Sequence, residues 1–294
     1  MNFLSGYGKP AGSTLALHPD VRLINFTGST ATGKLIQEMA AKSNLKRVQL
    51  ELGGKSPTIV FEDTDIEKAA AETAFSIRFV SGQACIANSR IYVQDTIADR
   101  FRKAFAEAFK QIKVGNPLDP ETTHGPQADE IQFKRVSEYL KLIKDSKAKV
   151  HMGGGAIKTE SGNGFFIEPT IFSDLPENAR PMKEEIFGPV VAINTFHTEA
   201  EAIAKAVDSE YGLYSSVYSQ NISRALRVAK AMEAGTVGVN CTSPSMASDM
   251  PFGGYKGSGI GRVGYGYSLE TYLETKTVLV KIDPASEEDL NGAH

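Results

Sequence analysis

Among the reactive side chains, the two cysteines come first, because a thiolate is a strong nucleophile. Cys85 stands between a loop of small residues, 81–84, and a strand-like run, 90–93. That position fits a catalytic nucleophile, and it equally fits a buried, unreactive thiol. Cys241 follows the strand-like run 235–240, and we expect it to be unreactive.

Glu51 is the second candidate, because it is a lone carboxylate at the end of the apolar run 48–52. A carboxylate in such a place loses hydration unless it has a partner or a role. If burial raises its pKa, it becomes a good general base near neutral pH. Gly53 and Gly54 follow it and let other groups approach closely. A salt-bridged strand end is the alternative that the residues leave open.

The third candidate is the segment Gly28–Lys34, GSTATGK, which follows a strand-like run and opens a helix-like one. Free N–H groups at a helix N-terminus bind phosphate well. The glycine spacing is close to that of a P-loop, but Leu35 stands where that motif needs Ser or Thr for magnesium. Triphosphate hydrolysis is therefore disfavoured, whereas diphosphate binding and an ordinary strand–turn–helix both stay open.

Composition and missing motifs exclude several other classes. Apolar residues make up 41% and charged residues 23% of the 294, as in a globular protein. The net charge of −3 gives no basic excess for nucleic acid. We find no HExxH, no Cys/His metal spacing and no G-x-S-x-G, so we expect no metal site and no serine hydrolase. We expect neither a signal peptide nor a membrane span, and two cysteines favour a reducing compartment such as the cytoplasm.

Strand-like and helix-like runs alternate along the chain, which predicts an α/β fold with a mostly parallel sheet. Paired glycines near 53–54 mark a candidate domain boundary. Two capping boxes are predicted, Thr64 with Glu67 and Thr198 with Glu201. The expected strands are 21–26, 48–52, 58–61, 90–93, 235–240 and 272–282, and the expected helices are 32–42, 64–74, 98–112, 133–143 and 198–207.

Six blocks, in this order, resemble the aldehyde dehydrogenase superfamily. They are Phe26–Ser29, Glu51–Pro57, Gly82–Cys85, Glu184–Val190, Gly235–Asn240 and Pro251–Gly259. The resemblance extends over 2–282 and implies an aldehyde dehydrogenase-like α/β fold. It implies an incomplete Rossmann-type cofactor domain and a complete α/β catalytic domain.

The resemblance also implies a function, the oxidation of an aldehyde to a carboxylic acid with NAD or NADP. Cys85 matches the nucleophile of the family. Its backbone N–H matches one of the two donors of the oxyanion hole. Glu51 matches the base that activates water against the thioester. Phe252 matches an aromatic of the substrate tunnel. The residues that match the cofactor site are Gly28, Ser29, Thr30, Gly33, Leu52, Glu185 and Phe187. A free thiol has a pKa near 8.5, so we expect activation of Cys85 by the cofactor, by Glu51 or by nearby amides.

Members of the family begin well before Met1, so the resemblance implies an N-terminally truncated chain. The missing part would hold the first Rossmann strands, the region that separates NAD from NADP and an oxyanion-hole Asn that neither Asn88 nor Asn240 replaces. The expected divisions are a cofactor-domain remnant (1–53), a catalytic domain (54–240), a return segment with an oligomerisation strand (241–283) and a disordered tail (284–294). The family implies a homo-oligomer. An inactive truncated protein and a cofactor-independent thiol esterase remain alternatives.

Overall fold

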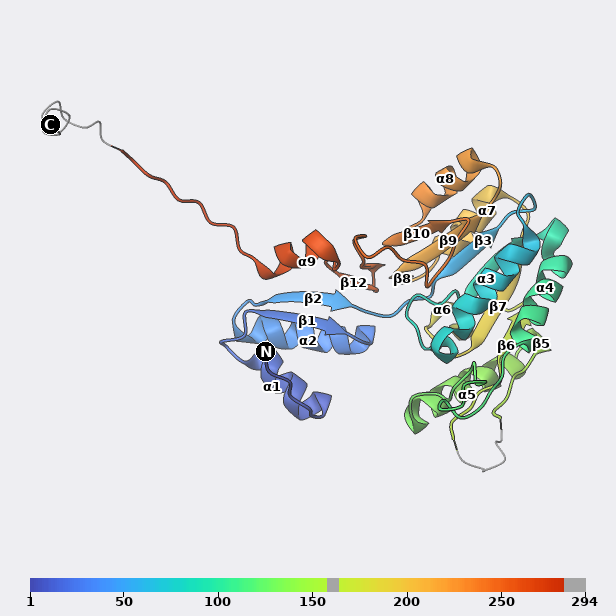
Figure 1. The fold of residues 1–294 in the computed structure, drawn as a ribbon, viewed down its shortest axis with the longest axis horizontal. Coiled ribbons are helices and arrows are strands. Elements are labelled where there is room, and N and C mark those ends of the chain that lie inside the picture. The colour runs from blue at the N-terminus through green and yellow to red at the C-terminus, as the bar shows by residue number, and fades with distance from the viewer. Residues whose placement is uncertain (158–163, 283–294) are drawn as a thin grey trace, which may run out of the picture.

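The computed structural model describes residues 1–157 and 164–282. Within them, the strands form a three-stranded sheet and a seven-stranded sheet, together with one short two-stranded ribbon. The two larger sheets are the centres of two units that lie side by side, a smaller one built mainly from the first 51 residues and a larger one (Figure 1). The α/β class predicted from the sequence is confirmed.

The smaller unit contains β1 (Leu23–Thr27), α2 (Thr30–Ser43) and β2 (Arg47–Glu51), preceded by the short helix α1 (Ser13–Leu17). β1 and β2 are parallel, and their last residues, Thr27 and Glu51, are paired. β12 (Gly259–Ile260) returns from the far end of the chain and pairs antiparallel with β2. The predicted strands 21–26 and 48–52 and the helix 32–42 are confirmed within a few residues.

The larger sheet has the order β10-β9-β3-β4-β7-β6-β5, and only β5 runs antiparallel to its neighbour. Its strands are β3 (Pro57–Val60), β4 (Arg90–Gln94), β5 (Lys149–Met152), β6 (Thr170–Ser173), β7 (Val190–Phe196), β9 (Tyr214–Tyr218) and β10 (Thr236–Val239). The ribbon pairs β8 (Tyr211–Gly212) with β11 (Tyr255–Lys256).

Alternate residues of the central strands bury against helices on the two faces of this sheet. Val60 and Ile91 belong to the cluster built with α3 (Ile66–Arg78) and α4 (Ala98–Lys110). Their neighbours Ile59 and Tyr92 belong to the cluster built with α7 (Glu199–Val207) and α8 (Ile222–Ala231). Because side chains alternate along a strand, each strand contributes to two apolar layers. The remaining helices are α5 (Glu130–Lys144), α6 (Arg180–Lys183) and α9 (Tyr265–Tyr272).

The N-cap of one predicted capping box is confirmed, although the Glu201 side chain accepts from the N–H of His197, at 2.8 Å, in place of the N–H of Thr198. The Thr198 side chain accepts a hydrogen bond from the N–H of Glu201 and begins α7. The other prediction is wrong by one residue, because Asp65 caps α3 by accepting from the N–H of Lys68, at 3.0 Å. Thr64 lies in the preceding turn instead, where its N–H donates to the carbonyl of Phe61. Asp and Thr are both good caps, so residue type alone could not separate them.

The predicted strand 272–282 differs from the structure. Tyr272 ends α9, and 273–282 belongs to none of the sheets formed by the described residues. The segment is extended and leaves the body of the molecule (Figure 1). The expectation of extended backbone agrees with the structure, but a strand also needs a neighbour to pair with. The expected tail, 284–294, lies outside the described residues.

Candidate active site

The two units meet where the carboxyl ends of β1 and β2 face the loop that precedes β4. A pocket of about 360 Å³ lies there. Its lining residues come from five separate segments of the chain and are Thr27, Gly28, Ser29, Leu52, Gly53, Gln83, Ala84, Cys85, Gln132, Arg135, Glu185 and Phe187. Six of the residues predicted from the sequence are in this set. The structure therefore brings together the Cys85 thiol, the Gly28–Ser29 turn between β1 and α2, and the Glu185–Phe187 segment.

The two glycines after β2 permit the closest contacts of the site. The N–H of Gly54 donates to Glu185 Oε1 at 2.8 Å. A Cβ on Gly53 would lie 2.5 Å from Glu185 Oε2, and a Cβ on Gly54 would lie 2.1 Å from the carbonyl oxygen of Cys85. Any side chain at either position would therefore push Glu185 or the Cys85 loop out of place.

The Cys85 thiol is partly buried. Burial raises its pKa to about 11, and the negative charges of Glu185 and Glu51 act in the same direction. The backbone N–H groups of Cys85 and Ile86 partly oppose this. The expectation that the cofactor, Glu51 or nearby amides activate the thiol stays a prediction, because burial and the like charges of Glu185 and Glu51 outweigh the effect of the two amides.

Glu51 ends β2 and is buried. Burial raises its pKa to about 7, against the opposing effect of the Arg262 charge. Neither carboxylate oxygen has a hydrogen-bond partner among the described residues. The salt-bridged alternative is therefore wrong for this residue. A carboxyl group with a pKa near 7 is suited to exchange protons at neutral pH.

The segment Gly28–Lys34 divides between the pocket and the helix. Ser29 lines the pocket and caps α2, its Oγ accepting from the N–H of Thr32 at 3.2 Å. Thr30 lies outside the lining, and its hydroxyl donates to the carbonyl of Gly257 at 2.9 Å. Gly33 also lies outside the lining, where a Cβ would meet Leu52 Cδ2 at 2.8 Å. The cofactor roles of Thr30 and Gly33 stay predictions, since the described contact of Thr30 is a hydrogen bond to Gly257 and that of Gly33 is packing against Leu52.

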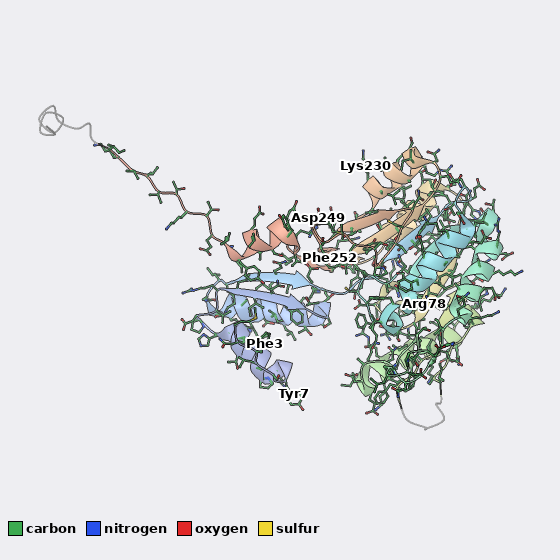
Figure 2. All side chains as sticks on the ribbon, in the orientation of Figure 1. Phe3, Tyr7, Arg78, Lys230, Asp249 and Phe252 are labelled. Carbon is green, nitrogen blue, oxygen red and sulfur yellow. The ribbon has the colours of Figure 1, made fainter. Side chains whose placement is uncertain are left out.

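Phe252 does not line this pocket. Its side chain packs with Cys85 against the small buried cluster of Ile86, Leu213 and Tyr214. Its backbone pairs with Val263, and Figure 2 labels it close to the junction of the two units. Phe252 is therefore near the nucleophile loop, and its place in a substrate tunnel stays a prediction.

Sequence reasoning missed two polar residues of α5. Gln132 Nε2 donates to the carbonyls of Ile186, at 3.1 Å, and Phe187, at 2.6 Å. Arg135 Nη2 donates to the carbonyl of Glu185 at 2.9 Å. These bonds hold Phe187 in a left-handed conformation, with φ of 59°. The sequence carries no signal for them, because Gln and Arg on a helix are usually solvated.

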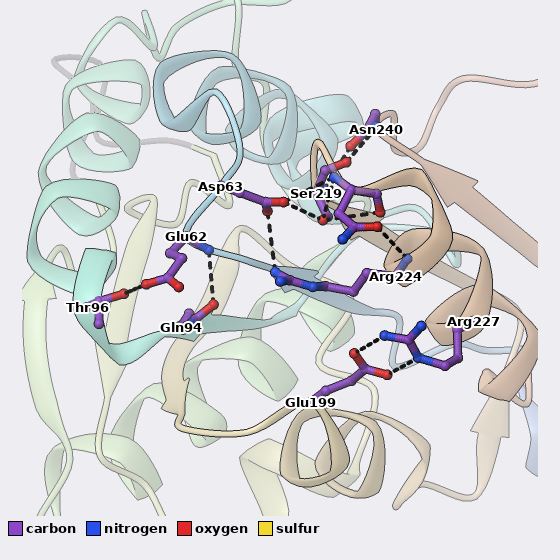
Figure 3. Close-up of polar contacts among 10 residues, drawn as sticks. Glu62, Asp63, Gln94, Thr96, Glu199, Ser219, Arg224, Arg227 and Asn240 are labelled. Atoms are coloured by element: carbon purple, nitrogen blue, oxygen red, sulfur yellow. Dashed lines mark hydrogen bonds and ion pairs between the residues drawn. The ribbon is translucent and has the colours of Figure 1, made fainter.

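A second group of polar side chains lies at the opposite edge of the larger sheet, beyond the carboxyl ends of its strands (Figure 3). Its members pair with one another. Asp63 accepts from the Ser219 hydroxyl at 2.9 Å and lies 3.6 Å from Arg224. Glu199 and Arg227 form a two-bond ion pair at 2.7 and 2.8 Å. These contacts fasten α7 and α8 to the strand ends.

Two further expectations concern metal and membrane. Within 1–157 and 164–282, no three His, Cys, Asp or Glu side chains are grouped so that they could hold a metal ion. Over the same residues, the longest apolar helices fall short of what a membrane crossing requires.

The fold and the pocket define an α/β protein with a cysteine at the junction of two sheets. The model of the aldehyde dehydrogenase family matches residues 1–278. The chain belongs to that family.

Curated relatives and solved structures agree with this assignment. An aldehyde dehydrogenase of Davidiella tassiana is 47% identical over 97% of this chain and 57% of its own length. Retinal dehydrogenase 2 of Mus musculus is 46% identical over 96% of this chain and 54% of its own length. A C302A mutant of the indole-3-acetaldehyde dehydrogenase of P. syringae, in complex with NAD+ and IAA, has a TM-score of 0.92 at 42% identity. The match covers 95% of this chain and 56% of that one. Betaine aldehyde dehydrogenase of Staphylococcus aureus, in complex with NAD+, has a TM-score of 0.90 at 39% identity. The match covers 96% of this chain and 56% of that one. The chain thus spans just over half the length of these relatives.

Proposed function

We propose that the protein oxidises an aldehyde to a carboxylic acid with NAD or NADP. One observation carries the proposal: Cys85, Glu185 and the Gly28–Ser29 turn line the same pocket. A nucleophile, a partly buried carboxylate and a helix N-terminus in one cavity suit this two-substrate reaction. The family membership, and the NAD+ bound in the two solved relatives, support the choice of cofactor.

The chain's own residues supply the covalent steps. Cys85 Sγ attacks the aldehyde carbonyl carbon and forms a C–S bond, giving a thiohemiacetal whose oxygen is near the N–H of Cys85. A bound nicotinamide cofactor would supply the hydride acceptor for that carbon, and Cys85 would then carry the acyl group as a thioester. Glu51 then takes a proton from water, the water oxygen attacks the thioester carbon, and the C–S bond breaks to release the acid and the thiolate.

The residues present fit the cofactor. The α2 N-terminus is suited to a diphosphate. The Gly28 N–H is not available for this, because it donates to the carbonyl of Glu51 at 3.0 Å. The bond from Gly54 N–H leaves one Glu185 oxygen to accept from a ribose hydroxyl. Oxidised nicotinamide carries positive charge, and a positive charge near Cys85 would lower the thiol pKa, which burial holds near 11.

The domain divisions follow the same proposal. Residues 1–53 contribute the cofactor side of the pocket, 54–240 the catalytic domain, and 241–283 the return segment. Two free cysteines support a cytoplasmic location. A cofactor-independent thiol esterase is the second candidate, because attack by Cys85 on an ester and hydrolysis of the acyl group with Glu51 as base need no cofactor.

NADH or NADPH formation with a short aliphatic aldehyde tests the proposal, alongside p-nitrophenyl acetate hydrolysis. We expect absorbance at the reduced-nicotinamide band in the wild type and at least a ~1,000-fold loss in Cys85→Ala. The matched control is Cys241→Ala, which removes the other thiol and should be near neutral. Ester cleavage without reduced nicotinamide would favour the esterase, and neither activity in a folded sample would refute both.

A further inference from the structure

Asn88 is a fully buried amide three residues after Cys85, and the proposed reaction does not use it. Its side chain is at the centre of a group of buried hydroxyls, which we call the Asn88 cluster. The hydroxyls of the cluster belong to Thr58, Ser76, Ser216, Thr242 and Ser243, each no more than 3% exposed.

Three of these hydroxyls lie within hydrogen-bond distance of the Asn88 amide oxygen. The Ser76 and Thr242 hydroxyls donate to Asn88 Oδ1, each at 2.5 Å. The Ser243 hydroxyl is 3.1 Å from the same oxygen. Ser76 is on α3, whereas Thr242 and Ser243 follow β10, so one oxygen joins a helix to a distant loop.

The amide nitrogen faces the sheet. Asn88 Nδ2 donates to Thr58 Oγ1 on β3 at 2.5 Å and to Ser216 Oγ on β9 at 3.4 Å. The Ser216 and Thr242 hydroxyls are also 2.6 Å apart. The cluster therefore ties the loop to strands that belong to the core of the larger sheet.

Two bonds lead from the cluster to the nucleophile loop itself. The N–H of Asn88 donates to Ser76 Oγ at 3.1 Å. The Ser243 hydroxyl donates to the carbonyl of Ile86, the residue after Cys85, at 2.7 Å. On the other side, the carbonyl of Cys85 lies close enough to Gly54 to exclude any Cβ there. The loop is thus held between the cluster and the glycine pair.

We propose that Asn88 is a positioning residue for Cys85 and that Ser243 is the link through which it acts. The inference deepens the proposed function and rests on it. A buried polar group without a partner is costly, so the loop cannot shift without breaking bonds in a water-free site. Because hydrogen bonds are directional, such a network restrains the backbone next to Cys85, and through it the thiol, more tightly than apolar packing would.

The experiment compares variants that each remove one buried polar group, in a Cys241→Ser background so that Cys85 is the only thiol. Ser243→Ala removes the bond to Ile86, and Asn88→Ala removes the centre of the cluster. The matched control is Thr73→Val. Thr73 is buried on α3, like Ser76, but its hydroxyl bonds to Ala69 and Ala70 within the helix, outside the cluster. Thermal unfolding establishes that each variant is folded, and Ser243→Ala keeps the test decisive if Asn88→Ala does not fold.

The readout is the pH profile of Cys85 alkylation by iodoacetamide, followed by peptide mass spectrometry. We expect the Ser243→Ala profile to move to lower pH, with about tenfold faster alkylation near pH 7, because a released thiol regains water. The kcat for p-nitrophenyl acetate should fall about tenfold or more in the same variant with little change in KM. Thr73→Val should keep the wild-type profile and kcat.

An unchanged profile in Ser243→Ala, or an equal shift in Thr73→Val, would overturn the positioning role. These outcomes are separate from the fate of the proposed function. If the wild type forms no reduced nicotinamide, the dehydrogenase proposal fails, whereas the alkylation profiles still decide whether the Asn88 cluster holds the thiol.

Discussion

At the scale of single residues, Glu51 combines two properties that are rarely found together. It ends a β-strand, and both of its carboxylate oxygens are buried without a hydrogen-bond partner among the described residues. Burial alone accounts for the rise of its pKa to about 7, since Arg262 acts in the opposite direction. Such a group is costly to keep ionised, and a cost of that kind is usual at a functional position.

The first residue-scale prediction concerns turnover. In Glu51→Gln the thiol can still attack and the hydride can still leave, but no base activates the water. We expect an initial burst of reduced nicotinamide of about one equivalent, followed by steady turnover lowered by about 100-fold or more. Stopped-flow absorbance measures both phases. Loss of the burst together with turnover would contradict the deacylation role.

The second concerns stability against pH. The folded-state pKa of Glu51 is raised from 4.5 to about 7, so the folded protein holds a proton that the unfolded chain releases. Its contribution to stability is therefore fully present below pH 4.5 and is lost as the pH rises through 7. Glu51→Gln, which stays neutral, should raise the thermal midpoint relative to wild type at pH 8, with the difference shrinking towards pH 5. A difference that does not vary with pH would refute the buried-carboxylate account.

At the scale of elements, the helix starts follow local chemistry, and α3 offers a clean test. Its cap is Asp65, whose side chain accepts from the N–H of Lys68, whereas the neighbouring Thr64 makes no capping bond. Asp65→Ala should therefore lower the free energy of unfolding by about 1 kcal/mol. Thr64→Ala is the matched control and should change it by less than about half of that. Urea denaturation measures both, and equal losses would show that the helix start is shared.

Most elements were predictable from periodicity, because a helix such as α4 buries one apolar face, here with Phe101, Phe105 and Phe109. The site was predictable only in part. Cys85, Glu185 and Ser29 stand in recognisable blocks, and the structure brings them to one pocket. Gln132, Arg135 and the Asn88 cluster were not predictable, because their bonds join segments far apart in sequence and their residue types are common on ordinary surfaces and in turns. The segment 273–282 was wrongly predicted as a strand for a related reason, since the residue pattern of one segment does not show whether a neighbouring strand lies beside it.

At the scale of the whole molecule, that segment offers the strongest apolar surface outside the two units. Val278, Leu279, Val280 and Ile282 are all largely exposed, with Leu279 at 92%. An extended apolar stretch is suited to pair with a sheet edge of another copy. We therefore expect the protein to self-associate through this segment, in keeping with the homo-oligomer that the family resemblance implies.

A charge placed in the segment tests this directly. Leu279→Glu would bury a carboxylate in the contact, so we expect a smaller species than wild type by size-exclusion chromatography with light scattering at equal concentration. Leu118→Glu is the matched control, because Leu118 is 89% exposed on the larger unit and away from the segment, and it should keep the wild-type mass. A monomeric wild type, or equal masses in all three proteins, would remove 273–282 as the contact. A smaller mass only in Leu279→Glu would mean that the segment pairs as a strand with a second copy of the chain.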